Sequence, residues 1–340
     1  MSKITVKERI LQFFLEHQNA AVSGESLAED LQVSRTAVWK AICALREEGY
    51  RIEGTQNLGY RMLLPDDSEE KDRFNAAEIR ALLPEDARAF YEIHTTPKTG
   101  STNTDVREAG IRGEREGFVL LAESQTAGRG RQGRSFYSPK GSGLYLSILL
   151  RPSIPAAEAV LITAMAGVAA SRAVEALLPE GHEKVMIKWV NDLYYHGHKV
   201  CGILTEGLLS METGGFDQAV LGLGFNLVSP EGGWPAEIRE VAGGLFSSGK
   251  PAGARVKLAA AFLREFLPLY RGLQERTFLP EYRSRMLVLG ETVDVLLPDG
   301  TEKAAEAVDI DDHCRLLVRF SGEDVLTPLG SGEVRIKISS

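Results

Sequence analysis

The chain has 340 residues, of which 44% are hydrophobic and 25% are charged, and its formal net charge is -8. This length and composition indicate a globular protein of two or three domains and exclude a disordered or fibrous chain. The longest apolar stretch, residues 159–170, is shorter than the roughly 20 residues that cross a bilayer, and the charged N-terminus lacks a secretion signal. We therefore expect a cytoplasmic protein without a membrane partner.

Residues 1–64 carry the pattern of a winged helix-turn-helix domain. Apolar residues recur at helical spacing over 4–15, and Ser23 begins a second short helix. Ser34 is a suitable N-cap for a third helix over 35–48, which Gly49 ends. Residues 50–53 and 60–63 are then predicted to form a small hairpin, the wing.

The third helix of this domain is predicted to recognise DNA, because polar and basic side chains lie early on it. The predicted DNA-binding residues are Ser34, Arg35, Thr36 and Lys40 on that helix, and Arg51 and Arg61 beside the wing. Residues 1–64 hold eight basic and eight acidic side chains, so one domain alone should bind DNA weakly. A homodimer that reads two half-sites is the expected remedy.

A linker is predicted at 65–73, where PDDSEEKDR has no apolar residue beyond its proline, and an α+β domain follows over 74–285. Helices are predicted over 75–83, 156–178 and 256–273, and strands over 89–93, 117–122, 144–150, 185–190, 199–208 and 218–227. Since several consecutive strands lack a helix between them, the sheet should be mixed. The stretch 229–253, rich in glycine and proline, is expected to be a long, mobile loop.

Residues 286–340 are predicted to form a small C-terminal β-domain. Its short strands, 292–296, 303–310, 315–320, 324–327 and 333–338, are separated by tight turns such as Pro298-Asp299-Gly300. Several short strands within a segment of this size are typical of an SH3-like β-barrel.

The sharpest chemical signal is residues 128–134, GRGRQGR, which we call the Gly-Arg loop. Glycines let a ligand approach the backbone, and arginines donate charge-assisted hydrogen bonds to carboxylate or phosphate. The loop is therefore predicted to bind an anion, the alternative being a flexible basic surface loop. It also matches the dinucleotide pattern G-x-G-x-x-G, but the chain continues through Pro139 and Gly141 into a strand and not into a helix. The P-loop pattern is absent from the sequence.

Two further segments, KWVND at 188–192 and KVCGIL at 199–204, place charged and amide groups at strand ends. Such groups suit the wall of a pocket. Asn191 and Asp192 could hold adenylate hydroxyls or Mg²⁺, which prefers oxygen ligands. The alternative is an ordinary polar turn in which Lys199 is a solvated residue at the start of a strand.

Histidine and cysteine give no metal signal. His196 and His198 lie in a predicted turn without a third ligand nearby, and they are interpreted as turn residues. Cys43, Cys201 and Cys314 are far apart and form no C-x-x-C motif, which argues against both disulfides and zinc.

Two small-residue clusters complete the candidate pocket. Ser101, Thr102 and Asn103 open a predicted helix, either as an N-cap cluster or as hydroxyl and amide groups that meet a ligand. The sequence GLGFN at 222–226 ends a predicted strand, and glycines within a strand mark close approach of a ligand or another backbone.

In this order, GRGRQGR, KWVND, KVCGIL and GLGFN resemble the biotin protein ligase family, and the N-terminal winged helix resembles that of its bifunctional, repressing members. The resemblance covers essentially the whole chain. Val190 stands where the family usually has proline, which should loosen the turn that presents Asn191 and Asp192. Phe136 replaces the more usual tryptophan, and Gln132 occupies a variable position.

The resemblance implies which residues bind each substrate. The implied biotin pocket is Ser101, Thr102, Asn103, Gln125, Arg129, Gly130, Arg131, Lys199, Gly202, Gly222 and Gly224. The implied ATP and adenylate site is Arg131, Arg134, Phe136, Asn191, Asp192 and Asn226, with Asp192 as a candidate Mg²⁺ ligand. The catalytic residues would be Lys199, Arg129 and Arg131.

The resemblance also implies the reaction and its partners. Biotin would attack ATP to give biotinyl-5'-AMP, and a lysine of the biotin carboxyl carrier protein, an acetyl-CoA carboxylase subunit, would accept the biotinyl group. With biotinyl-AMP as corepressor, a homodimer would bind operator DNA and repress biotin genes. A lipoate ligase would share the fold and the reaction class, and a transcription factor with a purely ligand-sensing central domain is the other alternative.

Overall fold

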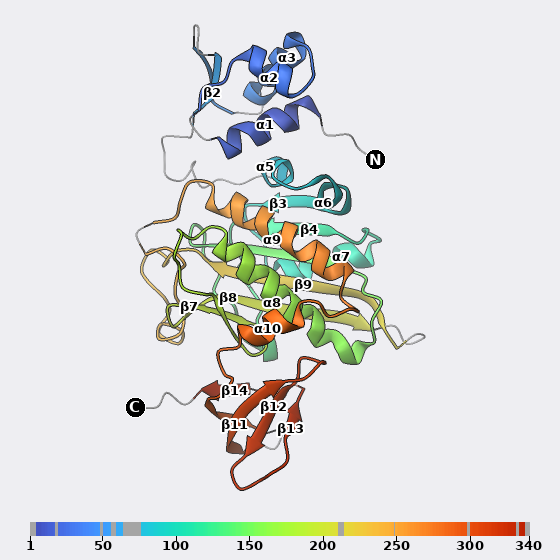
Figure 1. The fold of residues 1–340 in the computed structure, drawn as a ribbon, viewed down its shortest axis with the longest axis vertical. Coiled ribbons are helices and arrows are strands. Elements are labelled where there is room, and N and C mark those ends of the chain that lie inside the picture. The colour runs from blue at the N-terminus through green and yellow to red at the C-terminus, as the bar shows by residue number, and fades with distance from the viewer. Residues whose placement is uncertain are drawn as a thin grey trace.

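The computed structural model describes residues 5–17, 20–47, 50–55, 59–63, 76–209, 214–247, 249–297, 300–330 and 333–336. Three parts follow one another along the long axis of the molecule: a small helical domain, a central sheet flanked by helices, and a C-terminal sheet (Figure 1). The predicted linker, residues 65–73, and the predicted helix end at Gly49 lie outside the described residues.

The N-terminal part is the predicted winged helix-turn-helix. Its elements are α1 (Val6–Glu16), α2 (Gly24–Asp30), α3 (Arg35–Glu47), β1 (Ile52–Thr55) and β2 (Gly59–Met62), with β1 and β2 antiparallel. The hydroxyl of Ser23 accepts a hydrogen bond from the Ser26 backbone N–H, and that of Ser34 accepts one from Ala37. Both serines therefore cap their helices as predicted.

This domain rests on the first helix of the central part, α5 (Ala76–Ala81). Ala81 belongs to the same apolar cluster as Ile10 and Phe14 of the winged helix. At the edge of the contact, Nε of Arg80 lies 3.2 Å from Oε1 of Glu8. The two cores therefore meet through α5, although the intervening linker is polar.

The central sheet has seven strands in the order β3-β4-β5-β9-β8-β7-β6. Their bounds are β3 Glu92–Thr96, β4 Phe118–Ala122, β5 Gly143–Leu150, β6 Met186–Lys188, β7 Asp192–Tyr195, β8 His198–Leu209 and β9 Phe216–Asn226. Only β3 and β4 pair in parallel among these strands, and the others pair antiparallel. The predicted mixed sheet is thus confirmed.

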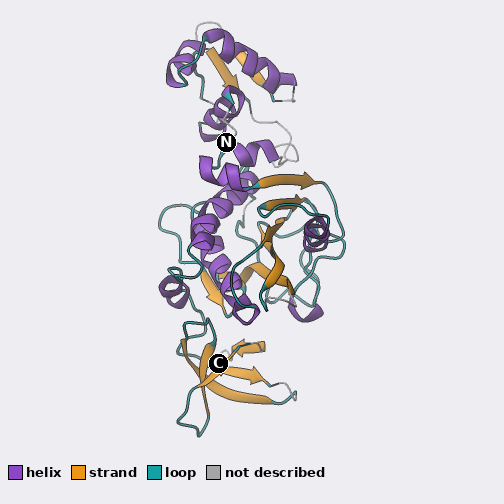
Figure 2. Cartoon of the chain, turned by 90° about the vertical axis from the view of Figure 1, so that its right-hand side faces the viewer, coloured by secondary structure: helices purple, strands orange, loops and turns teal. Residues whose placement is uncertain are grey.

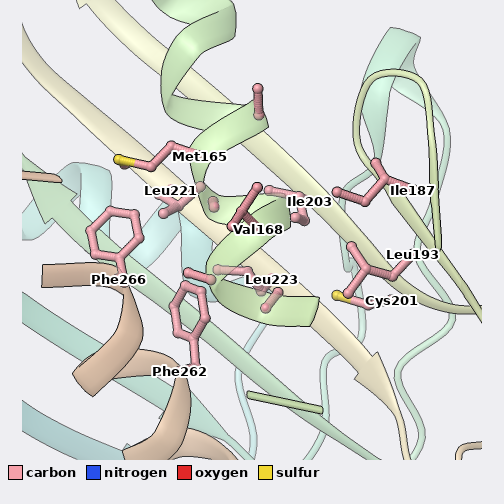
Figure 3. Close-up of a cluster of buried hydrophobic side chains, with 14 of the residues drawn as sticks. Met165, Val168, Ile187, Leu193, Cys201, Ile203, Leu221, Leu223, Phe262 and Phe266 are labelled. Carbon is pink, nitrogen blue, oxygen red and sulfur yellow. The ribbon is translucent and has the colours of Figure 1, made fainter. Parts of the chain in front are cut away.

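Helices α8 (Ala159–Glu175) and α9 (Ala254–Arg271) cover one face of the sheet, and α7 (Thr102–Ile111) packs against the other (Figure 2). Val168 of α8 and Phe262 and Phe266 of α9 meet Leu221 and Leu223 of β9 in the main core (Figure 3). The stretch Ala156–Glu175 is long and apolar enough to cross a membrane by length and composition alone, but most of its apolar window is buried inside the structure, as in a core helix. Burial of this face supplies the main apolar driving force of the domain.

A buried ion-pair network joins α8 to α10 (Leu279–Ser284). Arg285, 5% exposed, contacts Glu175 at 2.6 Å and Glu281 at 2.8 Å, and its backbone carbonyl accepts a hydrogen bond from Ile187 of β6. Burial alone would raise the pKa of Glu281, but hydrogen bonds from Arg172 and Arg285 outweigh it and lower this pKa. The network fixes the edge of the sheet that leads into residues 188–192.

The C-terminal part is a five-stranded antiparallel sheet in the order β13-β12-β11-β10-β14. Its strands are β10 Thr292–Leu296, β11 Glu302–Ile310, β12 Leu316–Phe320, β13 Thr327–Leu329 and β14 Glu333–Ile336. The predicted turn at Pro298-Asp299-Gly300 is only partly described. Pairing within the described strands leaves the sheet open, so the predicted closed barrel is not confirmed.

Several predicted elements need correction. The strand predicted over 89–93 begins only at Glu92, because α6 (Glu85–Phe90) occupies its first residues, with Glu85 and Asp86 at the favourable N-terminal end of the helix dipole. Residues 324–326 are not a strand. Short elements β7 and α10 were not predicted, since four to six residues carry too little periodicity to reveal them.

Candidate active site

The candidate site is a cavity of about 420 Å³ on the α7 face of the central sheet. All sixteen residues predicted to bind biotin or the adenylate line it, although they come from helix α7, three loops and strands β7, β8 and β9. Their individual roles stay predictions, but the fold brings the whole predicted set around one space.

Glycines of β8 and β9 form the floor of this cavity by giving room to two side chains. A Cβ on Gly222 would lie 1.9 Å from Oδ1 of Asn103, and one on Gly224 would lie 2.3 Å from Cε1 of Phe136. A Cβ on Gly202 would lie 3.0 Å from the same ring. Only glycine therefore fits at these positions, because the side chains of Asn103 and Phe136 pack directly against the sheet.

One end of the cavity is a hydrogen-bonded polar cluster at the start of α7. The backbone N–H and hydroxyl of Thr102 both donate to Oε1 of Gln125, at 2.9 and 3.1 Å. Ser147, fully buried on β5, contacts Thr102 Oγ1 at 2.7 Å and Asn103 Oδ1 at 2.6 Å. Ser101 is the N-cap residue, but its hydroxyl makes no capping hydrogen bond, so Gln125 supplies the acceptor at this helix start.

The Gly-Arg loop forms the outer wall. Gly130 N–H donates to the Arg134 carbonyl at 2.7 Å, and a short 3-10 turn, Arg131–Gly133, contains Gln132 at φ 55°. Arg131 Nη1 donates to Oδ1 of Asn191 at 3.2 Å. Arg129 and residues 132–134 of the loop are exposed, and Arg129, Arg131 and Arg134 all line the cavity.

Residues 188–192 form the opposite wall, which is anchored in the protein interior. Tyr282 of α10 donates from its buried hydroxyl to the Val190 carbonyl at 3.1 Å. The indole N–H of Trp189 donates to the backbone carbonyl of Cys314 in the C-terminal part at 3.0 Å. Asn191 donates to the Ile203 carbonyl of β8 at 2.9 Å. These bonds hold the turn at Val190 and Asn191 in place.

Lys199 and Asp192 meet between the two walls, with Nζ 2.8 Å from Oδ2. The other carboxylate oxygen, Asp192 Oδ1, is buried and has no hydrogen-bond partner among the described residues. Mg²⁺ is commonly held by one or two carboxylates together with phosphates and water. The unpartnered oxygen of Asp192 fits a Mg²⁺ ion that arrives with a nucleotide, while its other oxygen pairs with Lys199.

Two titratable groups beside Lys199 stay protonated near neutral pH. Burial raises the pKa of the Cys201 thiol well above its usual range. Burial first, and the Asp192 carboxylate second, raise the pKa of Tyr194 to about 12. The positive charges of the site therefore face no thiolate or phenolate.

The cavity also includes residues that the sequence interpretation did not assign. Trp234, Glu237, Ile238 and Val241 line it from within the stretch predicted only as a long loop. That stretch is tied to the sheet, because the Lys199 N–H donates to the Val241 carbonyl at 2.8 Å. Trp234, an aromatic residue within a glycine-rich segment, was the sequence feature that could have indicated this part of the cavity.

Most of the predicted DNA-binding side chains of the winged helix are exposed. Ser34, Arg35, Thr36 and Lys40 of the α3 start are all exposed. Trp39, not singled out by the sequence interpretation, is 55% exposed on the same face. On the wing, Arg61 Nη2 lies 3.7 Å from Glu53 Oε2, and Arg51 is exposed.

Comparisons with known proteins show the family to which the chain is similar. Residues 96–226 match the Biotin/lipoate A/B protein ligase family, and residues 6–61 match an HTH domain. The chain is 30% identical to the "Bifunctional ligase/repressor BirA" of Bacillus subtilis, over 92% of this chain and 94% of that protein. It is 31% identical to the protein of the same name from Escherichia coli, over 93% and 92%. The solved biotin protein ligase from Aquifex aeolicus in complex with biotin and ATP is 28% identical, covers 74% of this chain and all of its own, and superposes with a TM-score of 0.59.

Proposed function

The chain belongs to the family of bacterial bifunctional ligase/repressors, and from this premise we propose that it activates biotin with ATP and transfers it to a carrier lysine. The observation that carries the proposal is the convergence of Lys199, Arg129 and Arg131 around a glycine floor, between a polar cluster and a buried carboxylate. The related ligase solved with biotin and ATP supports both substrates.

The reaction joins two anions, and this sets what the site has to do. The carboxylate of biotin attacks the α-phosphorus of ATP, pyrophosphate leaves, and biotinyl-5'-AMP remains. Lys199 neutralises the biotin carboxylate, and Arg129 and Arg131 stabilise charge that develops on the phosphate. Bound with the nucleotide, Mg²⁺ would supply further charge neutralisation at Asp192.

The Gly-Arg loop protects the product of this step. A mixed anhydride hydrolyses in water, so a loop that closes over it excludes water until the acceptor arrives. In the second step, a lysine amine of the carrier attacks the biotinyl carbonyl, and AMP leaves. The expected carrier is the biotin carboxyl carrier protein of acetyl-CoA carboxylase, and both steps would take place in the cytoplasm.

The same chain acts as a repressor of biotin genes. We infer that residues 1–64 bind operator DNA through the exposed face of α3 and the wing, that 65–73 link them to the ligase domain, 74–285, and that 286–340 form the C-terminal domain. Since residues 1–64 carry no net charge, useful affinity needs two linked half-site contacts. Biotinyl-AMP would act as corepressor by promoting a homodimer.

Pyrophosphate release by the purified chain tests the enzyme proposal directly. ATP should be consumed when biotin and Mg²⁺ are present. It should not be consumed when lipoate replaces biotin, or when neither acid is added. Release that is independent of biotin, or equal with lipoate, would contradict biotin ligation. A chain that binds biotin without consuming ATP would instead be a ligand-sensing transcription factor.

A further inference from the structure

Glu206 is a charged residue whose carboxylate contacts two groups of the pocket. It lies on β8 two positions beyond Leu204 and four beyond Gly202, so alternation places all three on one face of the sheet. Its Oε2 accepts a hydrogen bond from Nδ2 of Asn103 at 2.8 Å. Its Oε1 lies 3.3 Å from Nη1 of Arg129. The carboxylate thus joins α7 to the Gly-Arg loop.

Both neighbours of Glu206 are hydrogen-bond donors. The Asn103 amide nitrogen and the Arg129 guanidinium can only donate, and the two oxygens of a carboxylate can accept from both. A glutamine of the same size would offer one acceptor and one donor, so one neighbour would face an N–H group. Both the length and the negative charge of the Glu206 side chain therefore suit these two neighbours.

The contact with Glu206 fixes the orientation of the Asn103 amide. With Nδ2 directed at the carboxylate, Oδ1 faces the Ser147 hydroxyl at 2.6 Å, and the absence of a side chain at Gly222 leaves room for it. Asn103 is 5% exposed and lines the cavity. A buried amide held at both ends offers a ligand one fixed pattern of donor and acceptor.

The contact with Arg129 has a different character. The Arg129 side chain is 45% exposed and that of Glu206 is 31% exposed. An ion pair this accessible to solvent contributes little to folding stability. Its consequence is local, because it limits where the guanidinium at the start of the Gly-Arg loop can point.

We propose that Glu206 is a positioning residue of the biotin site, which holds Asn103 and Arg129 in the orientation that receives biotin. This inference rests on the proposed function, since it takes biotin as the ligand. Glu206 does not touch the reacting atoms, so its removal weakens biotin binding more than it slows the chemical step.

The test is the biotin dependence of pyrophosphate release at saturating ATP for the full chain and for Glu206→Gln. Loss of one charge-assisted hydrogen bond should raise the KM for biotin about tenfold, with kcat changed by less than about threefold. Glu206→Asp keeps two acceptors and should restore part of the affinity. Glu92→Gln is the matched control, because Glu92 is an exposed carboxylate on β3 that contacts His94 and Arg115 outside the cavity. It should keep the wild-type KM.

Arg129→Ala provides a second measurement on the same contact. If Glu206 acts partly through Arg129, the double variant should raise KM by less than the product of the two single effects. A wild-type KM for biotin in Glu206→Gln overturns the inference while leaving biotin ligation intact. Absence of biotin-dependent pyrophosphate release in the wild-type chain overturns the proposed function and this inference with it.

Discussion

The two walls of the cavity are built differently. Residues 188–192 are held from the interior by Tyr282 and by the Cys314 carbonyl, and Trp189 and Val190 are buried. The Gly-Arg loop is exposed over residues 132–134 and contacts the rest of the site through the side chains of Arg129 and Arg131. One wall is thus formed before a ligand arrives, and the other can close over it.

This difference separates two kinds of substitution. Changes to the anchors of residues 188–192 should lower the stability of the fold together with activity, because they remove buried hydrogen bonds. Changes to the arginines of the loop should lower activity and leave stability nearly unchanged, because surface contacts contribute little to it. Lys199 lies between the two walls and should have the largest effect on the reaction.

The largest effect is expected for Lys199→Ala and Arg131→Ala. Each removes a positive charge aimed at the reacting anions, so adenylate formation should slow by about 100-fold or more. Single-turnover pyrophosphate release measures this step. Lys303→Ala is a control, because Lys303 lies over the Phe320 ring in the C-terminal sheet. Wild-type rates in both site variants would remove these residues from the catalytic step.

The next effect concerns closure of the loop and DNA binding. An adenylate that orders the Gly-Arg loop removes its entropy before a second subunit associates. Biotin with ATP should therefore tighten binding to a two-fold symmetric operator by a coupling of about tenfold. Operator titration with sedimentation in parallel measures affinity and mass together.

Arg35→Ala should abolish this DNA binding without altering pyrophosphate release. Arg35 is exposed on α3, which lies in the N-terminal part, away from the central sheet that carries the cavity (Figure 1). Equal affinity and equal mass with and without biotin plus ATP would leave the enzyme intact but eliminate the repressor switch.

Gly224→Ala tests the packing of Phe136, which follows the Gly-Arg loop, against the sheet. Its Cβ would lie 2.3 Å from the Phe136 ring, so the ring must shift, at a cost of about 1–3 kcal/mol. Both the melting temperature and the affinity for ATP should fall. Gly330→Ala is the control, since a Cβ there meets nothing within 4 Å. Unchanged ATP affinity in Gly224→Ala would show that Phe136 is not part of the nucleotide site.

The smallest effect is expected for Tyr282→Phe. Loss of the buried hydrogen bond to the Val190 carbonyl should lower the free energy of unfolding by about 1 kcal/mol, with only a modest decrease in pyrophosphate release. Denaturant unfolding measures the first and a steady-state assay the second. A stability equal to that of the wild-type chain would mean that this anchor does not hold the turn.

The sequence predicted the Gly-Arg loop better than the anchors of the opposite wall, and the reason is physical. Motifs with glycine and arginine reveal the loop because those residue types are needed for the ligand itself. The anchors of residues 188–192 were not predicted, since Tyr282 and Cys314 are ordinary core residues until the fold brings them to Trp189 and Val190. Glu206 escaped notice in the same way, because its two partners lie 103 and 77 positions away along the chain.

The long elements were predicted well and the short ones poorly. Helices α3, α8 and α9 and strands β5, β8 and β9 fall close to their predicted ranges, because each carries a long apolar pattern. The open C-terminal sheet shows the limit of this approach. Strand patterns indicate that strands exist, but closure depends on pairing between distant residues.

Hydrogen exchange on the two walls, with and without biotin and ATP, tests the central claim most directly. Backbone amides of the Gly-Arg loop should gain protection when both substrates are added. Amides of residues 186–195 should be protected already in their absence. Equal protection of the loop with and without the substrates, or an equal gain on both walls, would contradict a preformed wall facing a closing loop.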